Sequence, residues 1–271
     1  MVPFVLLSSV NPMNLLLLAA IGLSILFLQF SILWLVQYRI GNSAIVDVFW
    51  GGTVATVGVL FCLITDGDVT RRWVTSVLIS IWAIRLGSHL FVRWKSHAED
   101  ARYADLKLNW GENAQVRMFR FYQMQAAGAF LFTIPLLLAG SAQSAFGWID
   151  GVGIAIWVIA TVGESLADVQ LARFRKVPSN RGEVCRDGLW RYSRHPNYFF
   201  EWLQWWTYVA FAMTAPWGWL SILAPIAMWF FLNRVTGIPL TEIQSIKSRG
   251  DKYRHYQTTT NAFFPWFPSQ D

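Results

Sequence analysis

The chain has 271 residues, of which 55% are hydrophobic and only 14% carry a charge, whereas about a quarter of the residues of an average soluble domain are charged. The charges avoid long stretches of the sequence, so the composition indicates an integral membrane protein and excludes an ordinary soluble domain. The net charge of +6 comes from cations that gather between the apolar stretches, a pattern of membrane topology that excludes nucleic acid as a partner.

The apolar stretches predict about seven transmembrane helices, because a helix needs about 20 mostly apolar residues to cross the hydrocarbon core. The last stretch is too long for one crossing, and Ala215-Pro216-Trp217-Gly218 interrupts it, so we divide it into two helices. Two further blocks contain few charges. The stretches without Asp, Glu, Lys or Arg are 1–38, 48–65, 121–149 and 202–233, and the two further blocks are 73–92 and 151–171.

The distribution of Lys and Arg predicts the orientation of these helices. Cytoplasmic loops close to a membrane collect cations, and most of the cations fall on one side if the N-terminus is outside and the C-terminus is cytoplasmic. We therefore expect an all-α polytopic protein with a single membrane domain over residues 1–271.

The cysteines and histidines predict no metal site. Cys62 and Cys185 are isolated, without a CxxC pair and without a histidine at metal-ligand spacing. We expect neither a disulfide nor a bound metal.

The densest polar segment runs from Glu164 to Glu201. Its first part predicts a helix with Glu164, Asp168 and Arg175 on one face, which favours either a ligand site or a stripe of ion pairs at the membrane surface. The loop Pro178–Gly188, which includes Arg181, has the glycines and cations of a turn that approaches an anion closely. Cations placed there for topology alone explain it equally well.

The stretch Ser193-Arg194-His195-Pro196-Asn197-Tyr198 is a sharper signal. Pro196 occupies the position where a helix begins, and Ser193 precedes it as a possible cap. Backbone NH groups and Arg194 at such a helix start suit a phosphate or a carboxylate. A lone histidine is more often structural, but Arg, His, Asn, Tyr and Glu within a few residues favour a functional site.

Three further acidic positions are candidates. Asp47 is the only charge between Arg39 and Asp66, and its alternative role is a helix N-cap. The run Glu99–Tyr103 by itself is typical of a solvated or ion-paired loop. Glu242 stands at the inner end of the seventh predicted span, where a carboxylate needs a partner.

Two sets of residues resemble a known family. The C-terminal set is Asp168, Arg175, Gly188-Leu189-Trp190-Arg191-Tyr192-Ser193-Arg194-His195-Pro196-Asn197-Tyr198, Gly250-Asp251-Lys252-Tyr253-Arg254-His255-Tyr256 and Phe264-Pro265. It is similar to the C-terminal half of the steroid 5α-reductase superfamily. The N-terminal set, Asp47-Val48-Phe49-Trp50-Gly51 and Glu99-Asp100-Ala101-Arg102-Tyr103, resembles the bacterial DUF1295 branch of that superfamily.

This resemblance implies an NADPH-dependent membrane oxidoreductase of the bacterial inner membrane, with its active site facing the cytoplasm. It implies reduction of a carbon–carbon double bond in a lipophilic enone, with residues 1–140 on the substrate side and residues 150–271 as the cofactor-binding half. The implied cofactor residues are Asp168, Arg175, Arg181, Tyr192, Arg194, His195, Asn197, Tyr198, Glu242, Tyr253 and Tyr256. The implied catalytic residues are Asp47, Tyr103 and Glu201.

The chain also departs from the steroid enzymes. Glu164 stands where they have an asparagine, and Asp47 and Trp50 replace a Gln-Glu pair of their second span. The substrate therefore need not be a steroid, and other isoprenoid or fatty lipids fit the expectation. Membrane lipid remains the other expected partner.

Two alternative functions stay open on the same residues. Arg-His-Pro-x-Tyr also resembles the isoprenylcysteine carboxyl methyltransferases, which use S-adenosylmethionine. A non-catalytic lipid-binding membrane protein that kept the fold is the third possibility.

Overall fold

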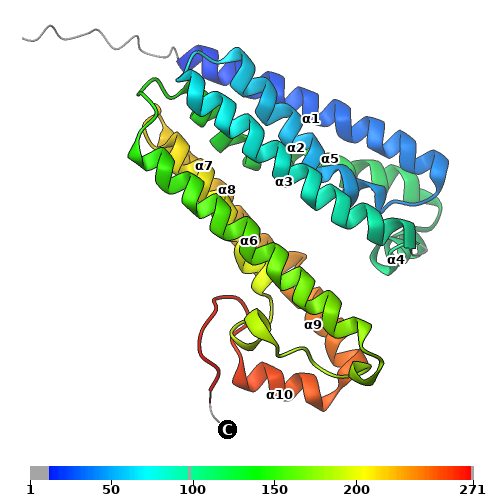
Figure 1. The fold of residues 1–271 in the computed structure, drawn as a ribbon. Coiled ribbons are helices and arrows are strands. Elements are labelled where there is room, and N and C mark those ends of the chain that lie inside the picture. The colour runs from blue at the N-terminus through cyan, green and yellow to red at the C-terminus, as the bar shows by residue number, and fades with distance from the viewer. Residues whose placement is uncertain (1–11, 97–98, 270–271) are drawn as a thin grey trace, which may run out of the picture. The chain divides into compact units, whose positions relative to one another are not determined.

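The computed structural model describes residues 12–96 and 99–269, and within these residues it contains helices and no strand (Figure 1). The all-helical class is confirmed. The ten α-helices of this described part are α1 (Pro12–Ile40), α2 (Ile45–Ile64), α3 (Val69–Ser96), α4 (Ala101–Trp110), α5 (Ala114–Ser141), α6 (Trp148–Lys176), α7 (Pro196–Ala212), α8 (Leu223–Phe230), α9 (Ile238–Arg249) and α10 (Asp251–Thr259).

Six helical segments of the described part are long and apolar enough to cross a membrane. They correspond to α1, α2, α3, α4–α5, α6 and the run from Gly218 to Arg249. The remaining predicted span coincides with α7, which has 17 residues and so lies at the short end of the range for a crossing. The count of seven and the orientation of the termini stay predictions, and the start of the first predicted span, 1–11, lies outside the described residues.

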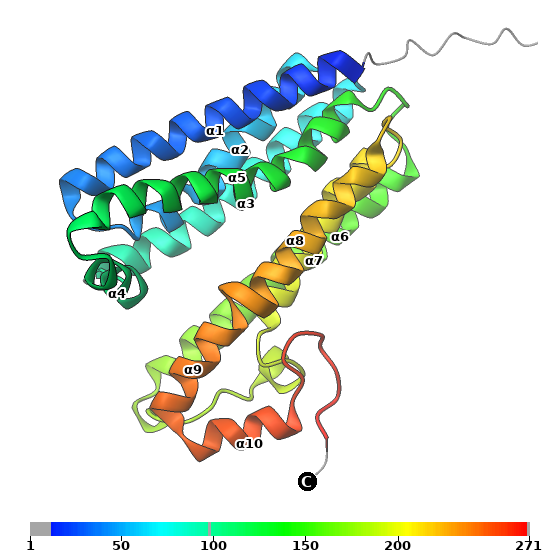
Figure 2. The same cartoon turned by 180° about the vertical axis from the view of Figure 1, so that it is seen from behind.

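The chain forms two compact units, 1–146 with 211–221 and 147–210 with 222–271. In the first unit, α1, α2, α3 and α5 pack side by side as a helical bundle, and α4 packs against α5 (Figures 1 and 2). The roles predicted for residues 1–140 and 150–271 stay predictions.

Glycines let the helices of the first unit approach closely. A Cβ atom at Gly58 of α2 would lie 2.3 Å from Cδ1 of Leu136 in α5, and one at Gly22 of α1 would lie 2.3 Å from the ring of Phe61 in α2. Small residues at such contacts are typical of membrane helices, which associate by close packing.

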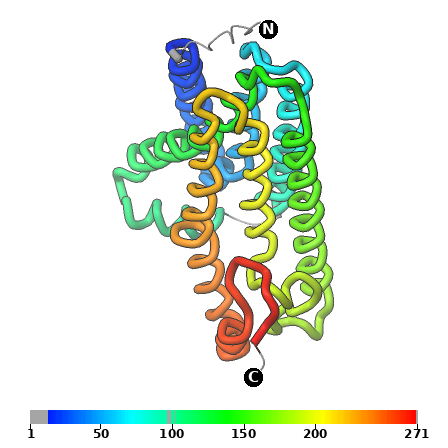
Figure 3. Tube along the Cα trace, turned by 90° about the vertical axis from the view of Figure 1, so that its left-hand side faces the viewer, coloured from blue at the N-terminus to red at the C-terminus, as the bar shows by residue number. Residues whose placement is uncertain are grey.

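The second unit consists of α6, α7, α8, α9 and α10. Figures 2 and 3 show α9 continuing the line of α8, and the π-helical stretch Phe231–Val235 joins them. α10 and the C-terminal segment lie beside the loop Val177–His195, at the end of this unit where α6 ends and α7 begins.

Two breaks fall where the sequence predicts them. α7 begins at Pro196 and ends at Ala212, before the interruption at Ala215-Pro216-Trp217-Gly218, and a short 3-10 helix starts at Gly218. Glycine is required there, because a Cβ atom would lie 2.2 Å from the carbonyl oxygen of Ala212. The loop Pro178–Gly188 is also a loop in the structure, with positive φ angles of 83° at Gly182 and 57° at Gly188.

Candidate functional site

The predicted site residues belong to both units. Asp47 and Tyr103 lie in the first unit, and the remaining candidates lie in the second. Each unit brings its own candidates into contact, so each is described by itself.

In the first unit, Asp47 is bound by two side chains from α4. The hydroxyl of Tyr103 donates to Oδ1 of Asp47 at 2.7 Å, and Nη2 of Arg102 donates to Oδ2 at 3.0 Å. Tyr103 is 4% exposed, while the side chains of Asp47 and Arg102 are 28% and 34% exposed. The phenol therefore reaches the carboxylate from a buried position, and the guanidinium supplies the counter-charge.

Asp47 is not a helix cap. The N-cap position of α2 is Ala44, which makes no side-chain capping bond, and Asp47 lies in the first turn of that helix. A carboxylate there also meets the positive end of the helix dipole, but its hydrogen bonds go to α4. The N-cap alternative is therefore wrong, and Asp47 is a tertiary contact.

The run Glu99–Tyr103 forms ion pairs and the start of α4. Asp100 is the N-cap, since its side chain accepts from the backbone N of Arg102 at 3.0 Å, and it also pairs with Nε of Arg102 and Nη2 of Arg93. Burial by itself would raise the pKa of the Asp100 carboxyl, but the hydrogen bonds and charge of Arg102 hold that pKa below its usual value. Asp100 thereby fixes the arginine that contacts Asp47.

In the second unit, a polar seam joins the facing sides of α6 and α7. Nδ2 of Asn197 donates to Oδ1 of Asp168 at 3.2 Å, and the hydroxyl of Thr161 donates to Oε1 of Gln204 at 3.5 Å. The two helices run in opposite directions, so Glu164 of α6 and Glu201 of α7 lie between these two contacts and at one level. Glu164 is 6% exposed and Glu201 is 9% exposed.

Gly163 of α6 faces an aromatic ring of α7 beside this seam. A Cβ atom at Gly163 would lie 2.4 Å from the ring of Phe200, so a larger residue would have to displace that ring. The amide nitrogen of Gln204 is buried and has no hydrogen-bond partner among the residues that the structure describes. The seam thus presents an unsatisfied donor one turn from Glu201.

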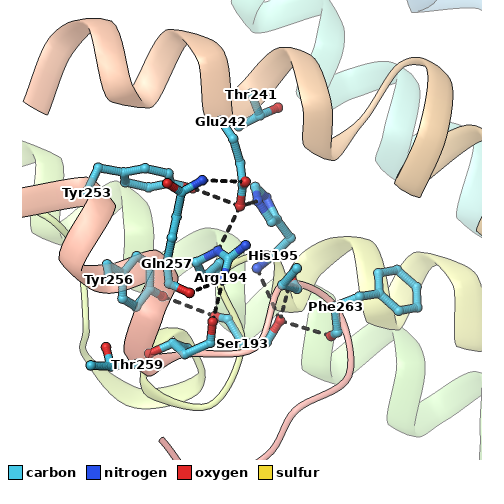
Figure 4. A network of polar contacts seen from close by, with 12 residues as sticks. Ser193, Arg194, His195, Thr241, Glu242, Tyr253, Tyr256, Gln257, Thr259 and Phe263 are labelled. Carbon is cyan, nitrogen blue, oxygen red and sulfur yellow. Dashed lines mark hydrogen bonds and ion pairs between the residues drawn. The ribbon is translucent and has the colours of Figure 1, made fainter. Parts of the chain in front are cut away.

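Glu242 of α9 is the centre of a second polar network (Figure 4). Its carboxylate accepts from Nε of Arg194 at 2.7 Å, from Nε2 of Gln257 at 2.7 Å and from the hydroxyl of Tyr253 at 3.5 Å. Nε2 of His195 lies 3.2 Å from the same carboxylate. One acidic side chain therefore joins the loop before α7 to α9 and α10.

Arg194 holds the C-terminal segment in place. Its Nη1 donates to the carbonyl oxygen of Gln257 at 3.0 Å and to that of Thr260, and its backbone N donates to the carbonyl oxygen of Asn261 at 2.9 Å. These bonds and the pair with Glu242 engage a side chain that is only 11% exposed. Phosphate binding by Arg194 stays a prediction, and its observed contacts are all within the chain.

Ser193 and Tyr256 complete this junction. Ser193 Oγ accepts from the backbone N of His195 at 3.1 Å and donates to the carbonyl oxygen of Phe263 at 2.9 Å. Tyr256 donates to the carbonyl oxygens of Trp190 and Ser193. Ser193 thus bonds the residue just before α7 and also binds the C-terminal segment, and its role as a helix cap stays a prediction.

The environment perturbs the titration of two residues of this network. Burial lowers the pKa of His195 below its ordinary value of 6.5, against the opposing effect of Glu242. Burial and the Glu242 charge raise the pKa of Tyr253 to about 12. At neutral pH both side chains are uncharged, and His195 stacks on Tyr198 with ring centroids 5.4 Å apart.

The other predicted cofactor residues lie around these contacts. Tyr198 contacts the hydroxyl of Thr241 at 3.2 Å, and the ring of Tyr192 packs against Phe267. Arg175, in the last turn of α6, and Arg181, in the following loop, have exposed side chains.

Sequence reasoning missed three partners of the candidate residues, namely Arg102, Gln204 and Gln257. Gln204 had a detectable signal, since it is the only strongly polar amide in the uncharged stretch before Asn233. Gln257 carried no signal of its own. Arg102 stands in the run that resembles DUF1295, but only the fold shows that it contacts Asp47.

The comparison with protein families identifies the chain. Residues 33–260 match the family described as "Protein of unknown function (DUF1295)". The chain belongs to the DUF1295 family. The match covers both the Asp47–Tyr103 contact and the Glu242 network, and the predicted DUF1295 membership is thereby confirmed.

A curated relative of this DUF1295 chain is an uncharacterized protein of the fission yeast Schizosaccharomyces pombe. It is 26% identical over 275 residues, which cover 90% of this chain and 79% of the relative. No solved structure matches the chain.

Proposed function

We propose that this protein is a membrane oxidoreductase that uses NADPH to reduce a carbon–carbon double bond of a lipophilic enone. The observation that carries the proposal is the junction of the second unit, where the loop Val177–His195 and the segment Gly250–Ser269 fold together over Glu242. Loops that meet at the inner ends of membrane helices, next to a polar seam, are a suitable place for a phosphorylated cofactor.

The second unit carries hydrogen-bond donors and cations that fit a dinucleotide. Gln204 has an unpaired buried amide NH for a carbonyl acceptor, and Asn197 offers an amide at the start of α7. Arg175 and Arg181 are exposed near the end of α6, and arginine pairs with phosphate through two parallel hydrogen bonds. Gln204 and Asn197 would hold the nicotinamide, and Arg175 and Arg181 would hold the phosphate groups.

When bound, NADPH would supply the hydride for the β-carbon of the enone. The remaining negative charge would develop on the carbonyl oxygen, which needs a hydrogen-bond donor. We assign this donor to Glu201 of the second unit, which is 9% exposed and lies one turn from Gln204, acting in its protonated form. A proton from solvent replaces the one that Glu201 delivers to the α-carbon.

Thermal unfolding of the full chain in detergent tests the cofactor. We expect NADPH to raise the unfolding midpoint and S-adenosylmethionine to leave it unchanged, because a ligand stabilises the state that binds it. The reverse result would favour the methyltransferase alternative.

An Asn197→Ala variant tests the proposed cofactor site more directly. We expect it to lose most of the NADPH response, while Asn233→Ala, whose amide donates to the backbone of Trp229 in an exposed position, keeps it. Equal NADPH responses of both variants, together with no NADPH oxidation in the presence of lipid extracts, would support a non-catalytic lipid-binding protein.

A further inference from the structure

A basic hollow in the second unit borders the Glu242 network at Thr260. It has a volume of about 350 Å³ and is lined by Arg186, Arg191, Thr259, Thr260, Pro268 and Ser269. The two arginines come from the loop before α7, and the hydroxyl-bearing residues come from the end of α10 and the C-terminal segment.

The arginines of this hollow are available for an anion. Among residues 12–96 and 99–269, neither Arg186 nor Arg191 forms an ion pair with a carboxylate, and both side chains are exposed. Arg186 lies over the ring of Tyr256, with 5.4 Å from its guanidinium carbon to the ring centroid. This contact with the ring fixes the direction of the Arg186 guanidinium. Asp187, the acidic neighbour of Arg186 in the sequence, is not among the residues that line the hollow.

Backbone contacts hold the C-terminal wall of the hollow in place. The backbone N of Trp266 donates to the carbonyl oxygen of Tyr192 at 2.9 Å, and that of Ser269 donates to the carbonyl oxygen of Thr259 at 2.9 Å. Phe267 packs edge-on against Tyr192, with centroids 5.7 Å apart. The wall is therefore an ordered part of the unit.

Two aromatic side chains project beside the hollow. Trp266 is 68% exposed and Phe267 is 74% exposed, although backbone hydrogen bonds hold the chain around them in place. Just before them, Phe264 packs against Trp202 of α7, with centroids 5.6 Å apart. The segment therefore runs along the start of α7, and exposed Trp residues of membrane proteins are enriched at the level of the lipid headgroups.

We propose that this hollow binds the phosphate of an anionic phospholipid headgroup, with Arg186 and Arg191 as the cationic ligands. Thr259, Thr260 and Ser269 supply hydroxyl groups around the phosphate, and Trp266 and Phe267 insert among the headgroups beside it. Arginines next to exposed aromatic residues favour a lipid over a soluble phosphate, because a soluble ligand gives Trp266 and Phe267 no apolar surface to contact.

Lipid titration of the purified full chain in detergent tests this proposal. The probe is phosphatidylglycerol, with bound lipid counted by native mass spectrometry, and a folded state is verified from the helical circular dichroism of each variant. We expect Arg186→Gln/Arg191→Gln to bind phosphatidylglycerol about 30-fold more weakly, since each cation near a membrane surface contributes about 1 kcal/mol. Lys252→Gln/Arg254→Gln removes the same charge from the exposed face of α10 and should bind as the wild type does.

Two further measurements distinguish the phosphate of a lipid headgroup from that of a soluble ligand. Trp266→Ser/Phe267→Ser keeps both arginines and should also weaken lipid binding, whereas NADPH should bind equally to all variants and inorganic phosphate should not displace the lipid. Unchanged lipid binding in the Arg186/Arg191 variant would overturn the proposal. Loss of NADPH binding in that variant would also overturn it, by assigning the hollow to the nucleotide.

Discussion

Tyr103 donates a hydrogen bond of 2.7 Å to Asp47, although 56 positions separate them in the sequence. The contact joins the first turn of α2 to the first turn of α4, so neither residue could be paired with the other by local spacing. The two candidates therefore form one carboxylate–phenol pair, and Arg102 supplies the positive charge that balances Asp47.

The catalytic role that the resemblance implies for Tyr103 predicts a turnover at least about 100-fold lower when phenylalanine replaces it. The free energy of unfolding should fall by about 1.5–3 kcal/mol, because Asp47 loses a hydrogen bond to a charged group. Steady-state NADPH oxidation and thermal unfolding measure the two effects.

Tyr122→Phe is the matched control. Its phenol also lies buried in the first unit but donates to the carbonyl oxygen of Ser43, so stability should fall and turnover should stay within a few-fold of the wild type. Equal turnover of Tyr103→Phe and the wild type would leave Tyr103 a structural residue.

Replacement of Glu242 by glutamine should destabilise the protein by about 3 kcal/mol. The substitution keeps the size of the side chain but leaves the buried Arg194 without its counter-charge. Chemical unfolding in detergent measures the change. As a control, Glu183→Gln breaks an exposed pair with Lys252 and should cost at most about 1 kcal/mol; similar losses from both substitutions would contradict the central role of Glu242.

His195 should make the stability of the protein fall in mild acid. Its pKa is lower in the folded chain than its ordinary value of 6.5, so the unfolded chain binds the proton more readily. The stabilisation is complete above about pH 6.5 and is lost as the pH falls through the folded pKa, at about 1.4 kcal/mol for each unit of difference.

The difference between wild type and His195→Gln isolates this effect from the titration of other groups. Between pH 7 and pH 5 the unfolding midpoint of the wild type should fall further than that of the variant. Parallel curves would mean that burial against Glu242 and Arg194 does not keep His195 neutral.

Gly163 should tolerate no side chain, because a Cβ atom would lie 2.4 Å from the ring of Phe200. We expect Gly163→Ala to destabilise the protein by about 1–3 kcal/mol through overpacking of α6 against α7. Gly151→Ala, in the same helix with no atom within 4 Å of its Cβ position, should be neutral or stabilise by up to about 1 kcal/mol. Thermal unfolding of the pair measures the contact, and a stable Gly163→Ala variant would show that the helices separate easily there.

Local features of the structure followed from sequence because their causes are local. α7 begins at Pro196, since proline is favoured at the first position of a helix. The division of the last apolar stretch needs a break, which Pro216 and Gly218 supply. Length and the absence of charge likewise specify the membrane helices.

The partners of the site residues were not predictable in this way. The sequence marks Glu242 as a carboxylate that needs a partner at the end of a predicted span. The side chains that bind it come from the loop before α7 and from α10. Phosphate binding by Arg194 stays a prediction, and its contacts with Glu242 and with carbonyl oxygens of the C-terminal segment are ones that the sequence did not predict. Such contacts depend on how loops close over long distances in the sequence, which periodicity does not encode.

By itself the sequence determined the helical membrane class, the positions of the main breaks and the segments where polar residues gather, because each depends on the composition of a short stretch of chain. Only the tertiary structure decided that Asp47 pairs with Tyr103, that Glu164 and Glu201 share one level of the α6–α7 seam, and that Arg186 and Arg191 line one hollow. Those relationships arise when separate helices and loops pack together, since packing then sets which polar groups lose water and must find one another.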